Sequence, residues 1–306
     1  MSATFSVVIP TLNRAPVLKK TLEGLQNQTF PRYEVIVVDD GSTDETRVVV
    51  EEAQRNFPVS LRYFYHPRMN AGAARNLGAQ HGEADFLVFL GDDTVPGTDF
   101  LDQHWKTRQE RRDSEPSTHL VIIGYTAWPE EFPKTRFMEY VGERGWQFGF
   151  SIIEDPENIP FNFFYTSNLS LSRRFFLENG GFDENFPECN WEDIELGLRL
   201  KRKGMRLVYA PQARTYHYHP ISISSFIRRQ HKVGRSAWTF YEKHPELGDF
   251  LGLPNVPQYT TRQRLKMWLI TGVCSLTENF NWPDLSRFYP DLMSYHYHLG
   301  ILKGGR

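Results

Sequence analysis

Two carboxylates directly follow an apolar run in the first third of the chain. Asp92 and Asp93 come after residues 86–90, Phe-Leu-Val-Phe-Leu, and after Gly91. A continuous apolar run of this length is typical of a strand buried in a parallel sheet. Open α/β sheets bind ligands at the carboxyl ends of such strands, and adjacent carboxylates repel unless a cation relieves them. The run therefore predicts a divalent cation shared with substrate phosphates, with a solvated acidic turn as the alternative.

A second acidic pair, Asp39 and Asp40, ends an earlier apolar run at residues 33–38. In neighbouring parallel strands, both pairs would project into the same crevice. One aspartate would then accept hydrogen bonds from a nucleobase imide while the other holds the loop, and a plain turn is the alternative. Residues 70–78, with Arg75, suit contact with a phosphate or a base edge, although they lack GxGxxG spacing and a Walker lysine.

The first hundred residues alternate between two kinds of segment. Strands are expected at residues 5–9, 33–38, 61–65 and 86–90, and helices after Asn13, after Ser42 or Thr43, and at 73–81. The residues named before the first two helices are the expected N-caps. This order predicts an α/β fold with a mostly parallel, Rossmann-like sheet, right-handed crossovers and flanking helices.

Length and composition exclude several classes of protein. The chain has 306 residues and a formal net charge of −2, so nucleic acid is not an expected partner. Cys189 and Cys274 cannot form a disulfide framework and favour a reducing compartment. No signal-peptide pattern precedes Phe5 and no apolar stretch is long enough to span a membrane. A cytoplasmic enzyme is the expectation.

Four sequence segments occur in a fixed order in the first hundred residues. They are 8–14 (VIPTLNR), 37–44 (VVDDGSTD), 70–78 (NAGAARNLG) and 90–93 (LGDD). Together they resemble the family 2 inverting glycosyltransferases of GT-A fold. The similarity continues at residues 166–170, 180–183, 191–196 and 216–217 and fades after about residue 240. The resemblance implies transfer of one sugar from a nucleotide-diphospho-sugar, with UDP as the expected nucleotide, to an acceptor hydroxyl.

The resemblance also implies roles for individual residues. The nucleotide-binding set is Pro10, Thr11, Asn13, Asp40, Arg75 and Asp92. Asp93 would be the principal metal ligand, with Asp92 near the ribose and the metal. Many members carry aspartate where this chain has Gly91, so the motif departs from the usual pattern but keeps its last two carboxylates.

His217 is implied to be a further ligand of the metal or the diphosphate. A nitrogen ligand beside two aspartates suits Mn²⁺ somewhat better than Mg²⁺. Alternating Tyr and His at 216–219 is also ordinary for an exposed strand, and His219 is given no role.

Asp193 is implied to be the general base, because an inverting transfer needs a carboxylate opposite the leaving diphosphate. Residues 190–204 also have the pattern of a helix that begins after Asn190 and ends at Gly204, which would explain an acid in its first turn. Glu192 is the alternative base.

The sugar or acceptor is expected to contact a small set of residues, Asn168, Gly181, Asp183 and Trp191. The glycine pair at 180–181 is equally explained as a helix C-cap.

Three regions are predicted: a nucleotide-sugar-binding subdomain at 1–100, an acceptor-binding and catalytic subdomain at 101–220, and a helical region at 221–306. Basic residues flank an apolar stripe at 226–237, which permits peripheral membrane contact, although a packed helix with a solvated basic face is favoured. The QxxRW signature of processive synthases is absent, which indicates one sugar per encounter. The acceptor, whether carbohydrate, lipid-linked or small molecule, is not specified.

Two other function classes stay open. One is a nucleotidyltransferase or other nucleotide-binding α/β enzyme, which the missing Walker lysine and the segment 191–193 (WED) disfavour. The other is a non-catalytic nucleotide-sugar binder, which would not need a base in addition to the paired carboxylates.

Overall fold

A computed structural model describes residues 2–67, 70–112, 119–186, 191–253, 255–280 and 284–305. Cys189 and the predicted cap Asn190 lie outside the described residues. The chain divides into two compact units. The first comprises residues 1–129, 152–185 and 192–219, and the second comprises 130–151, 186–191 and 220–306. The units cut across the three predicted regions because residues 130–151 group with the C-terminal helices.

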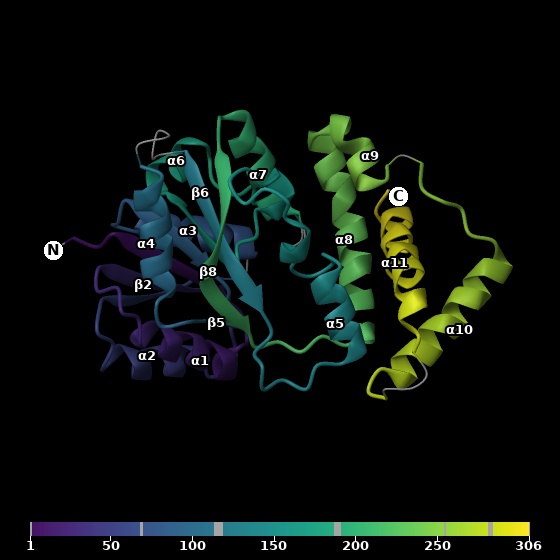
Figure 1. The fold of residues 1–306 in the computed structure, drawn as a ribbon, viewed down its shortest axis with the longest axis horizontal. Helices are drawn as coiled ribbons and strands as arrows, with labels where there is room; N and C mark the ends of the chain where they lie inside the picture. Colours follow the sequence, from purple (N-terminus) through teal and green to yellow (C-terminus); the bar gives the residue numbers. More distant parts are fainter. Residues whose placement is uncertain are drawn as a thin grey trace. The chain divides into compact units, whose positions relative to one another are not determined.

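The first unit is built on a mixed sheet (Figure 1). Its strands are β1 (Phe5–Thr11), β2 (Tyr33–Asp39), β3 (Leu61–Tyr65), β4 (Phe86–Leu90), β5 (Thr94–Pro96), β6 (Leu120–Ala127), β7 (Asn168–Ser172) and β8 (Arg206–His217). The described strands run in the order β3-β2-β1-β4-β7-β6-β8-β5. The first four are parallel, as predicted, whereas β7 is antiparallel to both of its neighbours and β5 is antiparallel to β8. The predicted α/β class is confirmed.

The helices of the first unit are α1 (Ala15–Gln26), α2 (Thr46–Gln54), α3 (Ala71–His81), α4 (Phe100–Glu110), α6 (Arg173–Glu178) and α7 (Glu192–Arg202). The caps predicted for α1 and α2 are wrong. One carboxylate, that of Asp44, accepts hydrogen bonds from the backbone N–H groups of Ala15 and Thr46, each at 3.0 Å. Asp44 can serve both helix starts because the loops after β1 and β2 lie side by side at the same edge of the sheet.

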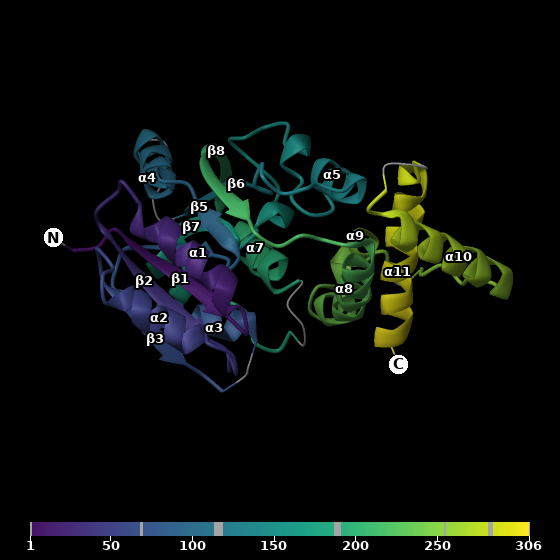
Figure 2. The same cartoon turned by 90° about the horizontal axis from the view of Figure 1, so that it is seen from below.

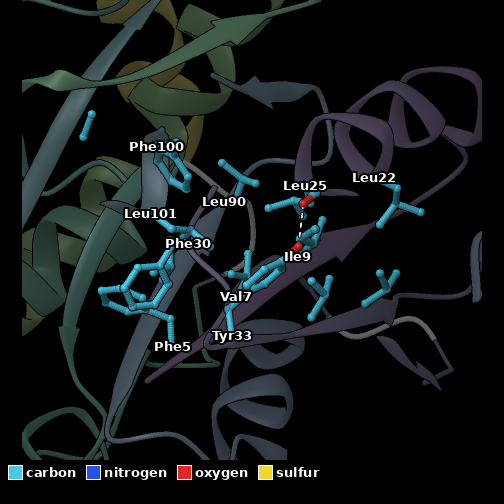
Figure 3. Packing of buried hydrophobic residues seen from close by; sticks show 14 of the residues in the cluster. Phe5, Val7, Ile9, Leu22, Leu25, Phe30, Tyr33, Leu90, Phe100 and Leu101 are labelled. Atoms are coloured by element: carbon cyan, nitrogen blue, oxygen red, sulfur yellow. Dashed lines mark hydrogen bonds between the residues drawn. The ribbon is translucent and has the colours of Figure 1, made fainter. Parts of the chain in front are cut away.

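The core between β1 and α1 explains why most residues of the first strand are apolar. Ile9 of β1 and Leu22 and Leu25 of α1 are fully or almost fully buried in one cluster (Figure 3). The hydroxyl of Tyr33 donates to the Leu25 carbonyl at 2.6 Å, so the polar end of this buried ring is satisfied. Both faces of β1 are covered, which holds its carboxyl end in place beneath the loops that follow.

The second unit is helical, which confirms the prediction for the C-terminal residues. Its helices are α5 (Arg136–Glu143), α8 (Ile223–Lys243), α9 (Gly248–Leu251), α10 (Thr261–Thr277) and α11 (Tyr289–Gly304). In both views α11 lies between α8 and α10 (Figures 1 and 2). Gly234 and Gly300 allow α8 and α11 to approach closely, because a Cβ on Gly234 would lie 2.2 Å from the Tyr297 carbonyl oxygen.

The apolar stripe predicted at 226–237 is the packed face of α8. Phe226 and Ala237 are buried there, while Arg228, Arg229 and Arg235 are exposed. This is the arrangement of a packed helix with a solvated basic face, as the sequence favoured. None of the helices in the described ranges is both long enough and apolar enough to cross a membrane.

Candidate active site

The acidic pair after β4 is held against the end of β1. The Thr11 hydroxyl donates to Oδ2 of Asp92 at 2.9 Å, and the Thr21 hydroxyl of α1 donates to the Asp92 carbonyl at 2.9 Å. Asp92 and Asp93 are both buried. The pairing of β1 with β4 therefore positions these carboxylates, and α1 fixes their backbone.

Strand pairing brings His217 to the same place. Thr94, the residue after Asp93, lies opposite His217 in the antiparallel pair of β5 and β8. Nε2 of His217 lies 3.5 Å from Oδ2 of Asp93. The backbone N–H of Tyr218 donates to the Asp93 carbonyl at 2.7 Å, which extends the pairing beyond the strand. The structure thus brings together the three residues that the sequence grouped as metal ligands.

Arg14 contacts both carboxylates, a role that the sequence analysis missed. Its Nη1 lies 3.5 Å from Oδ1 of Asp92 and forms an ion pair with Asp93. Arg14 belongs to the segment at 8–14, but its partners follow from the pairing of β1 with β4, which the sequence does not reveal. The guanidinium relieves the repulsion that two buried carboxylates would otherwise suffer.

The two aspartates differ in acidity because their surroundings differ. Burial, and then the charge of Asp93, raise the pKa of Asp92 to about 7 against the opposing effect of Arg14. Burial also opposes ionisation of Asp93, but His217, and then Arg14, together hold the pKa of Asp93 below its ordinary range. Asp93 is therefore the stronger anion of the pair, and the better candidate for a principal cation ligand.

The carboxylates of Asp92 and Asp93 and the imidazole of His217 suit a divalent cation whose remaining coordination positions are filled by other ligands. Carboxylate oxygens and imidazole nitrogen are ordinary ligands of Mn²⁺ and Mg²⁺. In the part of the chain that the structure describes, no three His, Cys, Asp or Glu side chains already form a group that could hold a metal ion. Arg14 shows that positive charge is accepted between the two aspartates. Oxygens from a diphosphate would have to complete the coordination of any metal there.

Gly91 has a steric explanation in this chain. A Cβ at this position would lie 2.4 Å from the Thr94 hydroxyl oxygen and 3.1 Å from Oδ1 of Asp93. An aspartate at position 91 would therefore require the Thr94 hydroxyl to move.

The two aspartates at the carboxyl end of β2 have different surroundings. Asp39 accepts hydrogen bonds from the Ser42 backbone N–H at 2.7 Å and from the Tyr63 hydroxyl at 2.6 Å, so Asp39 holds the loop. Asp40 is buried, and its backbone N–H donates to the Thr11 carbonyl at 2.9 Å.

Asn13 fastens the loop after β1 to the loop after β2. It has a left-handed φ of 53°, and its Oδ1 accepts from the Thr43 backbone N–H at 2.7 Å. Pro10 lies buried in β1, paired with Val38. The predicted nucleotide residues of these two loops are thus neighbours.

Arg75 of α3 lies between the acidic pair and the acids of α7. Its Nη1 is 3.4 Å from Oε1 of Glu192. Burial raises the pKa of both Asp92 and Asp193, and the charge of Arg75 opposes that rise. Among the described residues, Nε of Arg75 and Oε2 of Glu192 are buried without a hydrogen-bond partner. Buried polar atoms without partners are costly, which makes these two atoms candidates for ligand contact.

Asp193 occupies the first turn of α7. Its Oδ1 accepts from the Ile194 backbone N–H at 2.9 Å. Burial, and then the charge of Glu192, raise the pKa of Asp193 to about 7, while Arg75 opposes the rise. The side chain is nevertheless partly exposed. A carboxylate with this pKa and access is suited to accept a proton near neutral pH.

The prediction that Asn168 contacts the sugar does not agree with its surroundings. Its amide nitrogen donates to the carbonyls of Tyr125 and Ala213 at 3.1 and 2.8 Å. Its amide oxygen accepts from Nε2 of the His104 ring at 2.9 Å. Asn168 is fully buried. Its side chain joins β7 to β6, β8 and α4.

The glycines that follow α6 form its C-terminal cap, the alternative left open by the sequence. Gly181 has a φ of 62°, and its N–H donates to the Phe176 carbonyl at 3.1 Å. Asp183 accepts from the Asn185 backbone N–H at 2.9 Å. Trp191 belongs to the second unit, where its indole N–H donates to the Val233 carbonyl at 2.9 Å.

Comparison with known proteins decides the family. The model of glycosyl transferase family 2 matches residues 6–177, more than half of the chain. The chain belongs to glycosyl transferase family 2. The predicted family is confirmed.

Curated relatives support this assignment. Validoxylamine A glucosyltransferase of Streptomyces hygroscopicus subsp. jinggangensis is 31% identical over 278 residues, which covers 79% of this chain and 61% of the relative. Chondroitin synthase of Escherichia coli is 29% identical, covering 70% of this chain and 34% of the synthase. The chain thus spans about three fifths of the glucosyltransferase's length.

Solved structures confirm the GT-A fold. The mannosyltransferase PcManGT of Pyrobaculum calidifontis, in complex with GDP-Man and Mn²⁺, matches with a TM-score of 0.64 at 18% identity, covering 99% of this chain and 87% of that one. TarS 1–349 of S. aureus, in complex with UDP, matches with a TM-score of 0.56 at 18% identity, covering 99% and 92%.

Proposed function

We propose that this enzyme transfers one sugar per encounter from a UDP-linked donor to an acceptor hydroxyl, with inversion and with the help of a divalent cation. The observation that carries the proposal is the grouping around Arg75. The acidic pair Asp92–Asp93 and the partly exposed Asp193 belong to segments about a hundred residues apart, yet the charges of Asp92 and Asp193 both interact with Arg75. This grouping supports a leaving-group site and a proton acceptor that are both within the influence of one cation.

In the proposed reaction the acceptor oxygen bonds to the anomeric carbon as the bond from that carbon to the diphosphate oxygen breaks. Asp193 takes the proton from the acceptor hydroxyl. Arg75 faces the reacting region with a buried Nε that can donate to the donor. Arg75, whose position the fold fixes, stabilises the negative charge left on the nucleoside diphosphate.

Asp92, Asp93 and His217 would hold the divalent cation, which when bound supplies further positive charge to the leaving diphosphate. Their close approach supports this assignment, since Nε2 of His217 lies 3.5 Å from Oδ2 of Asp93. Asp40, at the neighbouring strand end, would accept from the nucleobase imide.

A panel of nucleotide sugars tests the reaction class. In the presence of Mn²⁺, we expect an intact UDP-sugar to raise the melting temperature more than UTP does, and UDP-glucose is the first donor to test in view of the glucosyltransferase relative. Inversion is checked by NMR of the anomeric proton of the product once an acceptor is found. Stabilisation by UTP alone would instead indicate a nucleotidyltransferase, and donor binding without transfer to any acceptor would indicate a binder.

The prediction for Asp40 concerns the base edge. Asp40→Ala should weaken UDP binding by about 1–3 kcal/mol, the usual effect of leaving a buried polar partner unmet. Isothermal titration with UDP measures this, with Glu51→Ala on the exposed face of α2 as the control. If the parent and Asp40→Ala bind every nucleotide with equal affinity, Asp40 does not contact the nucleobase and serves only in the turn.

The prediction for Arg14 follows from its position between the carboxylates. Because Arg14 and a divalent cation compete for Asp92 and Asp93, Arg14→Gln should bind Mn²⁺ alone more tightly. We expect a gain of a few-fold, since Arg14 is partly exposed and the ion pair is screened. Free Mn²⁺ measured by EPR gives the affinity without any turnover. Arg47→Gln, which removes a cation from an exposed pair with Glu51, is the matched control. Weaker Mn²⁺ binding by Arg14→Gln would contradict the competition.

A further inference from the structure

Helix α10 of the second unit carries two apolar faces. Met267 and Cys274 are 8% and 2% exposed, and Thr271 lies 3.2 Å, Oγ1 to Nε2, from His296 of α11. This side packs within the unit. The other side presents a stripe of large apolar residues, Leu265, Trp268, Leu269, Val273 and Leu276, followed by Phe280 just beyond the helix end. We call this stripe the α10 apolar face.

The α10 apolar face is too exposed to be an ordinary surface. Trp268 is 69% and Leu276 78% exposed, and the face holds six of the ten large apolar side chains that are exposed among the described residues. Its members recur every three or four residues, so they form one continuous stripe. A helix that is apolar on two opposite sides is normally covered on both.

The charges on α10 itself all have one sign. Arg262, Arg264 and Lys266 are exposed, and no Asp or Glu occurs between Thr261 and Thr277. At about 100° per residue, Arg264 and Lys266 fall on opposite sides of Leu265, so cations flank the stripe. Arg264 and Lys303 also line a hollow of about 480 Å³ that has apolar walls, including Trp238 and Leu302.

We infer that the α10 apolar face docks on an anionic lipid surface. Apolar side chains would enter the boundary between headgroups and acyl chains, where tryptophan is favoured, while the flanking cations meet anionic headgroups. A second copy of the chain fits less well. A symmetric contact through this face would bring the same cations together with no acid on the helix to neutralise them. The inference does not depend on the proposed function.

Vesicle sedimentation with the full chain tests the lipid surface. We expect binding to vesicles of mixed phosphatidylcholine and phosphatidylglycerol that weakens with salt, and much less binding to pure phosphatidylcholine. The double variant Trp268→Glu/Leu276→Glu should lower the partition coefficient by at least roughly tenfold, through lost apolar burial. Arg262→Gln/Lys266→Gln should lower binding to the mixed vesicles by roughly tenfold and remove most of the salt dependence.

The matched control is Val48→Glu, which places the same charge on an exposed apolar residue of α2, in the first unit. It should bind like the parent. Because the substituted side chains are exposed, all variants should melt like the parent. The inference is overturned if the parent does not bind mixed vesicles, or if Trp268→Glu/Leu276→Glu binds them equally well. It is also overturned if light scattering finds a dimer that this double variant converts to a monomer, while vesicle binding is absent.

Discussion

Asp193→Asn is expected to lower turnover by roughly a hundredfold or more, the usual scale for loss of a general base. Asparagine keeps the size of the side chain and can still accept the hydrogen bond from the Ile194 N–H, so α7 should begin as in the parent. It cannot take a proton. Turnover at saturating donor and acceptor is the measurement, together with a melting curve and the affinity for donor, both of which should stay near those of the parent.

Glu192→Gln is the matched control, because it makes the same change one residue earlier in the same turn. Glu192 pairs with Arg75 in the structure, so this variant should affect donor binding more than turnover. Transfer by Asp193→Asn within a few-fold of the parent would falsify the base assignment. If Glu192→Gln alone abolishes transfer, Glu192 is the base.

The same assignment predicts the pH dependence. Burial and Glu192 raise the pKa of Asp193 to about 7, so the carboxyl is largely protonated below that pH and cannot accept a proton. Turnover of the parent should therefore rise with pH through about 7 and then level off. The residual turnover of Asp193→Asn should lack this rise.

Much of the fold was predictable because its signals are local. The apolar run before Asp92 and the one before Asp39 each indicated a buried parallel strand, and both strands are present. Family motifs then indicated which side chains meet at the strand ends. His217 was predicted in this way, although only the pairing of β5 with β8 explains its distance from Asp93.

The misses have a common physical cause, which is that side-chain partners are chosen across the fold. Asp44 caps two helices because two loops are neighbours, a fact that neither loop reveals by itself. Arg14 pairs with acids about eighty residues away. Asn168 was expected to contact the sugar, but its amide nitrogen donates to carbonyls of β6 and β8. Local patterns predict elements well, whereas hydrogen-bond partners depend on strand order.

Asp93→Ala should abolish the Mn²⁺-dependent part of UDP binding. Asp93 is the more readily ionised of the two aspartates, because His217 and Arg14 favour its charged form, so its loss removes the strongest anion available to a cation. Asp92 would remain, but burial, the largest cause of its raised pKa, would still oppose its ionisation. We therefore expect the melting temperature of Asp93→Ala to respond to UDP equally with Mn²⁺ and with chelator, whereas the parent responds much more strongly with Mn²⁺.

Asp85→Ala is the matched control for this experiment. Asp85 is exposed and lies directly before β4, at the opposite end of the strand from Asp93. Its removal changes the net charge by the same amount without touching the strand end that carries the site, so the Mn²⁺ response should persist. Full UDP affinity of the parent in excess chelator would show that no cation is needed. In that case Arg14, already paired with both carboxylates, would be the resident positive charge of the site.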